Sequence, residues 1–269
     1  MARVLSISSQ VVRGHVGNSA AAFALQRLGH EVWILPTVVQ SNHPGHAHVA
    51  GTRISPEALR DMAGALAKNG WLGEVDAVLT GYLPTAEHVD FAAETIARLR
   101  ELRPNLLVVV DPVLGDDPGG LYVAEAAAAR VRERLLPLAD VLTPNRFELA
   151  WLSRAQVSDA ASAVMAASGL GASQVVATSI PDGSSGNLVN LLWQPGAVSS
   201  ALVPRLATVP HGTGDLLAAL HLARLLHGAS APQALRLAVA GVAAVIEASA
   251  GADELRLIGS QNLWAIHEV

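Results

Sequence analysis

The chain has 269 residues, of which 51% are hydrophobic, and this is enough to build one large α/β core. The formal net charge of −5 argues against the basic face that nucleic-acid binding requires, and the lack of cysteine excludes disulfides and thiolate chemistry. The apolar run closest to membrane-spanning length, 234–250, is interrupted by Arg236 and Glu247. We therefore expect a cytoplasmic protein without a nucleic-acid or membrane partner.

At the N-terminus the sequence predicts a strand, a helix and a second strand. The strands cover residues 3–8 and 31–38 and the helix covers 19–28, an order that is typical of a parallel sheet. The loop before the helix contains Gly14 and Gly17 but lacks the G-x-G-x-x-G pattern. A nicotinamide-dependent oxidoreductase is therefore disfavoured.

A polar segment at 40–51 follows the second strand, and we interpret it as a flap. Its histidines, His43, His46 and His48, could ligate a metal or could be solvated. The solvated flap is favoured, because a loop rich in glycine and proline gives a metal little fixed geometry. A helix is then predicted from Ser55 to about Gly70.

Strands and helices continue to alternate in the rest of the chain. Strands are expected at 76–82, 106–110, 140–142 and 174–179, antiparallel edge strands at 187–193 and 201–209, and helices at 86–102 after Thr85, at 124–138, after Pro144, at 216–226 and at 232–250. The predicted fold is one doubly wound, mostly parallel α/β sheet with helices on both faces. We expect residues 1–269 to form a single domain.

Polar or acidic residues recur where successive predicted strands end. They are Ser9, Tyr82, Asp111, Thr143 and Thr178. The carboxyl ends of parallel strands share one edge of a sheet, where open α/β sheets bind ligands. At Asp111 and the nearby Asp116 a cation or phosphate role is favoured over turn chemistry, since Mg²⁺ takes carboxylate and water ligands.

Residues 212–215, Gly-Thr-Gly-Asp, stand at the start of the apolar helix. Glycine lets a ligand approach the backbone, and the unpaired amides of a helix's first turn attract an anion. Asp215 could complement the helix dipole or act as a general base beside a bound phosphate. The only lysine is Lys68, beside a helix-stop signal, so phosphate chemistry would depend on backbone amides, a metal ion and arginine.

With these residues the chain resembles the pyridoxal kinases of the ribokinase-like superfamily. The matching segments span nearly the whole chain in order: Leu5-Ser6-Ile7-x-Ser9, Gly14-His15-Val16-Gly17-Asn18, Ser41-Asn42-His43, Gly81-Tyr82, Asp111-Pro112-Val113-Leu114-Gly115-Asp116, Thr143-Pro144-Asn145-x-Phe147-Glu148, Gly212-Thr213-Gly214-Asp215-Leu216 and Glu254-Leu255-Arg256-Leu257. The Gly-Thr-Gly-Asp segment marks the superfamily broadly. The N-terminal segments and the tail are more particular to pyridoxal kinases.

The resemblance implies ATP-dependent phosphorylation of the 5′-hydroxymethyl group of pyridoxal, pyridoxine or pyridoxamine in vitamin B6 salvage. It implies roles at three groups of positions: catalysis at Asp215 with the amides of Gly212, Thr213 and Gly214; ATP binding at Asp111, Thr143, Asn145, Glu148, Thr178 and Ser179; and substrate binding at Ser9, Val16, Pro44, Tyr82, His211 and Asp215. It also implies Mg²⁺ near Asp111, Asp116 and Glu148, stimulation by K⁺ in many members, and a homodimer.

Three departures from the family pattern affect substrate choice and rate. Pro44 replaces a threonine that contacts substrate, His211 replaces a small apolar residue, and no lysine can reach over the ATP phosphates. They keep two alternatives open, namely another ribokinase-like kinase, such as a hydroxymethylpyrimidine kinase, and a non-catalytic vitamer- or nucleotide-binding protein. The presence of Asp215 favours a kinase, because an idle site does not need a base.

Overall fold

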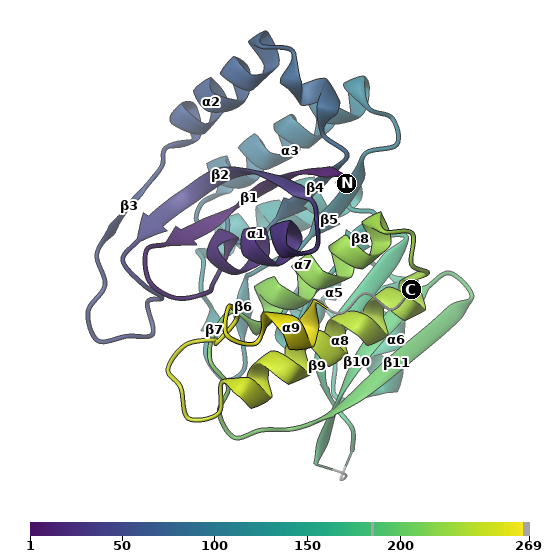
Figure 1. The fold of residues 1–269 in the computed structure, drawn as a ribbon. Coiled ribbons are helices and arrows are strands. Elements are labelled where there is room, and N and C mark those ends of the chain that lie inside the picture. Colours follow the sequence, from purple (N-terminus) through teal and green to yellow (C-terminus); the bar gives the residue numbers. More distant parts are fainter. Residues whose placement is uncertain (184–185, 266–269) are drawn as a thin grey trace.

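A nine-stranded sheet forms the centre of the computed structural model, which describes residues 1–183 and 186–265 (Figure 1). The strand order is β11-β10-β9-β8-β5-β4-β1-β2-β3. The strands are β1 (Arg3–Val11), β2 (Glu31–Gln40), β3 (Gly51–Arg53), β4 (Ala77–Thr80), β5 (Leu107–Val110), β8 (Val141–Leu142), β9 (Gln174–Pro181), β10 (Asn187–Gln194) and β11 (Ala197–Pro204). All neighbours from β9 to β2 pair in parallel, whereas β3, β10 and β11 pair antiparallel at the two sides.

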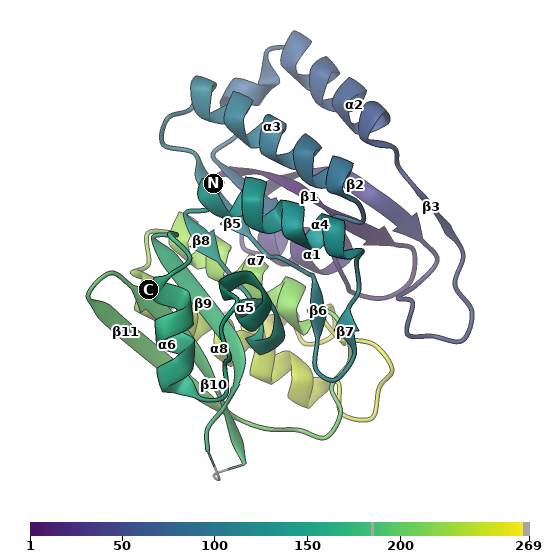
Figure 2. The same cartoon turned by 180° about the vertical axis from the view of Figure 1, so that it is seen from behind.

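Helices cover both faces of this sheet, as Figures 1 and 2 show from opposite sides. One face carries α1 (Asn18–Arg27), α7 (Thr213–Leu226), α8 (Ala231–Ala248) and α9 (Gln261–Trp264). The other carries α2 (Pro56–Lys68), α3 (Ala86–Leu102), α4 (Glu125–Arg130), α5 (Arg146–Ser153) and α6 (Ala160–Ser168). The predicted doubly wound, mostly parallel α/β fold is confirmed.

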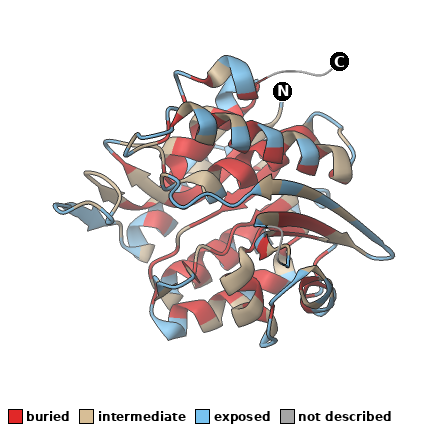
Figure 3. Ribbon diagram, turned by 90° about the horizontal axis from the view of Figure 1, so that it is seen from below, coloured by how far each residue is buried: buried red, intermediate tan, exposed pale blue. Residues whose placement is uncertain are grey.

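The most apolar segments lie between these layers. Every residue of β4 and all of β5 except Leu107 are buried, as expected for strands covered on both faces. In α7 nine consecutive residues, from Leu216 to Arg224, are buried, so this part of the helix is enclosed on all sides. Figure 3 shows the buried segments gathered in the interior and the exposed ones on the outside. Among the described helices only α8 is long and apolar enough to cross a membrane by length and composition, and it packs here against α7 and β11.

The order of the strands reverses at β1. β1 pairs with β2 on one side and with β4 on the other, and both pairs are parallel. The chain therefore leaves the carboxyl ends of β1 and β4 in opposite directions, which opens a crevice there. In open α/β sheets this is the place where ligands bind.

Several predicted elements have different bounds. The last edge strand is Ala197–Pro204 rather than 201–209, because the chain turns at Pro195-Gly196 and pairs at once with β10. The helix predicted at 124–138 is divided into α4, a π turn at Val131–Leu135 and a 3₁₀ turn at Leu136–Leu138, where Pro137 has no N–H for a helical hydrogen bond.

Five short strands and helices were not predicted from the sequence. These are β3, α6, α9 and the hairpin of β6 (Gly115–Asp116) and β7 (Gly120–Leu121). Ser55 caps α2 as predicted, with its side chain accepting a hydrogen bond from the Ala58 amide. The hydroxyl of Thr85, in contrast, makes no cap to α3 and lies 2.8 Å from His88 Nδ1.

Candidate active site

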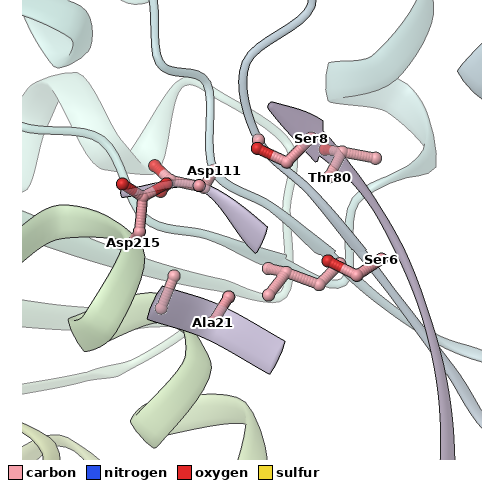
Figure 4. Close-up of a pocket in the computed structure, with 10 residues that line it drawn as sticks. Ser6, Ser8, Ala21, Thr80, Asp111 and Asp215 are labelled. Carbon is pink, nitrogen blue, oxygen red and sulfur yellow. The ribbon is translucent and has the colours of Figure 1, made fainter. Parts of the chain in front are cut away.

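A small cavity lies at the switch point, between the ends of β1 and β4 and the start of α7. It has a volume of about 10 Å³, room for about one water molecule. Its lining residues are Ser6, Ser8, Gly17, Ala21, Leu79, Thr80, Gly81, Asp111, Asp215 and Ala218. Figure 4 shows Asp111 and Asp215 side by side, with Ser6, Ser8 and Thr80 on the other side of the view. The cavity therefore joins two predicted functional carboxyls at one edge of the sheet.

Asp215 is the third residue of α7 and is partly buried at its N-terminus. The backbone N–H of Gly17 donates a hydrogen bond to its carboxyl group. Burial nevertheless raises the pKa of Asp215 to about 6, against the smaller opposing effect of this hydrogen bond. A carboxyl group with a pKa near 6 accepts a proton more readily than an ordinary aspartate and is still ionised at neutral pH.

Gly212 lets the backbone turn directly into the first turn of α7. It has a φ of 98°, and a Cβ placed on it would lie 1.9 Å from the carbonyl oxygen of His15. The first backbone hydrogen bond of the helix runs from the Leu216 N–H to the Gly212 oxygen. The amides of residues 212–214 therefore precede the helical ladder, and with the helix dipole they are suited to receive an anion. We call residues 212–214 the anion loop.

Asp111 lies on the other side of the cavity, directly after β5. It is 7% exposed, and burial together with the neighbouring carboxyls of Glu148 and Asp215 raises the pKa of Asp111 well above its ordinary value. The hydroxyl of Thr143, at the end of β8, opposes this shift. Negative groups thus converge from three elements, an arrangement that favours a cation or a bound proton.

Glu148 and Asn145 form a capping box at the start of α5. The Asn145 side chain accepts from the Glu148 amide at 2.9 Å, and Glu148 Oε2 accepts from the Asn145 amide at 2.9 Å. Glu148 Oε1 also accepts from the amides of Leu114, at 2.7 Å, and Gly115, at 3.5 Å. Burial raises the pKa of Glu148 to about 7 despite these donors.

The β6–β7 hairpin is attached to this capping box. Asn145 Nδ2 donates to the Gly115 oxygen at 2.7 Å, and Arg146 forms an ion pair with Asp117. Burial, and then a hydrogen bond to Asp116 on β6, raise the pKa of the Tyr122 phenol. The hairpin therefore carries Asp116 to the same side of the sheet as Glu148.

Within the described ranges 1–183 and 186–265, no three His, Cys, Asp or Glu side chains are arranged to hold a metal ion. The carboxyls of Asp111, Asp116 and Glu148 therefore do not form such a group, and neither do the three flap histidines. Mg²⁺ usually binds proteins through one or two carboxylates and takes its other ligands from water and phosphate. The mutually repelling carboxyls of Asp111 and Glu148 fit that mode, since a cation would relieve their repulsion.

The other predicted nucleotide-side residues, Thr178 and Ser179, lie inside β9, which continues to Pro181 instead of ending at residue 179 as predicted. The Thr178 amide donates to the Pro144 oxygen at 2.9 Å, which joins β9 to the loop before α5. Ser179 is exposed and has a φ of 61°, a left-handed conformation that is uncommon for serine. Strained residues of this kind often occur at ligand sites. Thr178 and Ser179 therefore border the same side as Asn145 and Glu148.

Of the predicted substrate residues, Asp215 lines the cavity, whereas Ser9, Val16, Pro44, Tyr82 and His211 are not among its lining residues. Gly17 is held so close to Ser9 that a Cβ on Gly17 would lie 2.2 Å from the Ser9 hydroxyl. Val16 is buried, and the Tyr82 amide donates to the Ser8 hydroxyl at 3.1 Å. Pro44 and His211 are exposed, and they lie on the flap and directly before the anion loop.

Ser6, Ser8 and Thr80, for which no role was predicted, form the floor of the cavity. Ser6 Oγ donates to Asn18 Oδ1 at 2.6 Å, and Asn18 Nδ2 donates to the backbone carbonyl oxygen of Ser8 at 2.9 Å. The buried hydroxyl of Thr80 has no hydrogen-bond partner in the described part of the chain. Ser6 and Ser8 stand on either side of Ile7 and follow the apolar Val4 and Leu5 in the same strand, and this alternation was the available signal, because buried polar groups need hydrogen-bond partners.

The sequence is similar to those of known proteins over most of its length. The sequence profile described as "Phosphomethylpyrimidine kinase" matches residues 24–257. A "Pyridoxal kinase PdxY" of Leifsonia xyli is 36% identical over 270 residues, covering 98% of this chain and 95% of that protein. A "Pyridoxine/pyridoxal/pyridoxamine kinase" of Bordetella avium is 41% identical, covering 86% and 80%.

The fold also matches solved structures over almost its full length. Pyridoxal kinase from Leishmania donovani in complex with ADP and pyridoxamine superposes with a TM-score of 0.91 and 34% identity, covering 97% of this chain and 95% of that one. The complex of the same kinase with ADP and pyridoxine gives a TM-score of 0.90 and 35% identity.

Proposed function

The chain belongs to the pyridoxal kinase family of the ribokinase-like superfamily, and from this premise we propose that it phosphorylates pyridoxal with ATP. The products are pyridoxal 5′-phosphate and ADP, and the reaction serves vitamin B6 salvage. Pyridoxine and pyridoxamine carry the same hydroxymethyl group and are further candidate substrates. Relatives that are named for these vitamers support the proposal.

One observation carries the proposal most directly: a general-base candidate and an anion loop occupy the same helix turn. Asp215 lies one residue beyond the amides of residues 212–214, at the switch point of the sheet. A base and an anion hole beside one another are what transfer of a phosphoryl group to an alcohol requires.

The reaction follows from these positions. Asp215 accepts the proton of the 5′-hydroxyl group as its oxygen forms a bond to the γ-phosphorus of ATP. The bond from that phosphorus to the bridging oxygen breaks, and its electron pair leaves with ADP. The amides of Gly212, Thr213 and Gly214 stabilise the negative charge of the transferring group. Catalysis here is positioning and charge stabilisation, with the proton held on Asp215.

ATP binds on the side of the crevice formed by β8, α5 and β9. Thr143, Asn145, Thr178 and Ser179 would contact the nucleotide, and Asp111, Asp116 and Glu148 would hold Mg²⁺ directly or through water. Mg²⁺ supplies charge neutralisation of the phosphates when it is bound. Ser9, Val16, Pro44, Tyr82 and His211 would surround the pyridine ring. K⁺ stimulation, a homodimer, a single domain and a cytoplasmic location belong to the same proposal.

A hydroxymethylpyrimidine is the second candidate substrate. The matching sequence profile carries the description "Phosphomethylpyrimidine kinase". In addition, Pro44 cannot supply the hydroxyl group that a threonine would offer to pyridoxal at that position. Both candidate substrates carry a hydroxymethyl group on an aromatic ring, so the same base and anion loop serve either one. The substrates must therefore be compared side by side.

The test measures ATP-dependent phosphorylation of pyridoxal, pyridoxine, pyridoxamine and hydroxymethylpyrimidine by the purified protein. We expect pyridoxal 5′-phosphate to form, and Asp215→Asn to lower kcat by about 10²- to 10⁴-fold, because the base is lost while the side-chain size is kept. Asp61→Asn, at an exposed position of α2, is the matched control. Binding of ATP with no turnover of any vitamer would refute the proposal.

A further inference from the structure

Two stacked imidazole rings connect the flap to the anion loop. The ring centroids of His43 and His211 lie 3.8 Å apart with an interplanar angle of 21°. His43 belongs to the flap, and His211 directly precedes Gly212. The two residues are far apart in sequence, so the stack fixes where the flap lies relative to the loop.

A hydrogen bond at the tip of the flap fixes the protonation state of His43 in this stack. The Gly45 N–H donates to His43 Nδ1 at 3.0 Å, so that nitrogen carries no proton and the ring is neutral. A Cβ on Gly45 would lie 3.0 Å from His43 Nδ1 and 3.1 Å from His211 Nε2. The turn at Gly45 thus packs against both rings. Protonation of His43 at Nδ1 would break the hydrogen bond that forms the turn.

The flap is held at a second point by the C-terminal tail. His46 Nε2 lies 3.1 Å from Glu254 Oε1, and Arg13 pairs with Glu254 at 3.2 Å and with Asp253 at 2.8 Å. The charged and titratable groups facing His43 are therefore His211, His46 and Glu254. Arg13 also joins the base of the flap, because its amide donates to the Ser41 oxygen at 2.9 Å.

We propose that His211 is a positioning residue for the phosphorylation reaction, whose ring holds the flap closed over the vitamer end of the site by stacking on His43. The inference rests on the proposed function, since it takes the substrate to lie beside the anion loop. The inference gives a role to His211, which stands where the family pattern has a small apolar residue. Pro44 offers no donor, and the stack supplies instead the closure that excludes water.

This closure depends on pH in a defined direction. Burial, and then the neighbouring His211, lower the pKa of His43 to about 4 in the closed flap. In an open flap His43 would titrate with a pKa of about 6.5. The closed flap is therefore most stable relative to the open flap above about pH 6.5. As the pH falls towards 4, His43 takes up a proton in the open flap first, and this weakens closure.

Three variants separate stacking from other contributions of the side chain. His211→Ala removes the ring, and His211→Phe keeps a flat ring that cannot be protonated. His48→Ala is the matched control, since His48 is an exposed flap histidine. Hydrogen exchange of the flap amides, Gly45 above all, reports closure without any substrate. Steady-state kinetics with pyridoxal and ATP report its effect on the reaction.

We expect His211→Ala to speed exchange at the Gly45 amide and to raise KM for pyridoxal, both by about 2- to 10-fold, the range of one stacked pair. KM for ATP should stay unchanged, because the nucleotide side lies on α5 and β9. His211→Phe should restore both values, and KM for pyridoxal in the parent protein should rise below about pH 6.5.

Unchanged exchange in His211→Ala, or a Phe variant as impaired as the Ala variant, would overturn the inference. So would an equal change in His48→Ala. The exchange measurement stands even if no vitamer is phosphorylated, so failure of the inference is distinguishable from failure of the proposed function. His211 is exposed, and thermal unfolding of each variant verifies that the fold is retained.

Discussion

At the scale of single residues, the site is defined by three carboxyl groups that share one region of low exposure. Burial raises the pKa of Asp111, Glu148 and Asp215. The negative charges of Glu148 and Asp215 raise the pKa of Asp111 further. Such crowding is costly for a folded chain, and it is kept where it has a use in binding or proton transfer. The three carboxyls have different hydrogen-bond partners, and we therefore expect them to have different roles.

The raised pKa of Asp215 predicts the pH profile of the reaction. A general base works when it is deprotonated, so kcat/KM for pyridoxal should rise with pH, reach half its maximum near pH 6 and level off above about pH 7. Initial rates between about pH 5 and 8 measure this, with a coupled assay verified at each pH. A rate that is flat down to the acid end of this range would contradict the assignment of Asp215 as the base.

The carboxyl residues were predicted from the sequence, but the floor of the cavity was not. Asp215 and Asp111 stand in short motifs whose glycines and prolines mark loops, and loop positions at strand ends are readable from sequence. Ser6, Ser8 and Thr80 lie inside strands, where only their burial makes them unusual. Burial of an individual side chain depends on which strands become neighbours, and local sequence does not specify that order.

At the scale of elements, α7 and the loop before it act as one unit. Gly212 is the point where the loop and the helix meet, and it has no space for a side chain against His15. Gly214, two residues later, lies inside the helix, and a Cβ added there would meet nothing within 4 Å apart from its chain neighbours and the nearby backbone of α7. The two glycines therefore make different demands on the fold.

Gly212→Ala and Gly214→Ala should separate these demands. We expect Gly212→Ala to lower the free energy of unfolding by roughly 1–3 kcal/mol or more, because it combines backbone strain with a clash. Gly214→Ala should leave stability unchanged or slightly higher, since alanine favours helix. Chemical denaturation of both variants measures the difference. Equal stability of the two would show that the contact with His15 is easily relieved.

Elements that are long or buried on both faces were predicted well, and short exposed ones were not. The buried runs of β4 and β5 and the capped helix α2 have clear local signals. The strands β3, β6 and β7 have two or three residues each and form only because a partner strand lies beside them. Local sequence carries little information about such pairings.

At the scale of the whole molecule, the layers enclose titratable groups that take no part in the site. His221 on α7 is fully buried, and burial lowers its pKa to about 4. His30, next to His227, also has a pKa lowered to about 4 by burial. Both rings are neutral in the folded protein at neutral pH, whereas in the unfolded chain they titrate with a pKa of about 6.5.

Acid sensitivity of the fold follows from His221. Its contribution to stability is fully present above about pH 6.5 and is lost as the pH falls towards 4, by up to about 3 kcal/mol. His221→Leu should flatten this part of the stability curve, while His48→Leu, at an exposed position, should not. Denaturation midpoints between about pH 7 and 4.5 provide the measurement. Parallel curves for the parent and His221→Leu would refute the prediction.

The helix that carries Asp215 has more buried residues than any other described helix, whereas the flap is largely exposed. Changes in the reacting groups are therefore tied to the integrity of the fold, but changes in the flap cost little folding energy. For protein engineering, α7 is therefore the segment that tolerates few changes, and the flap is the segment that can be varied. Libraries that vary residues 43–49 should yield enzymes with new acceptor alcohols more often than libraries aimed at α7.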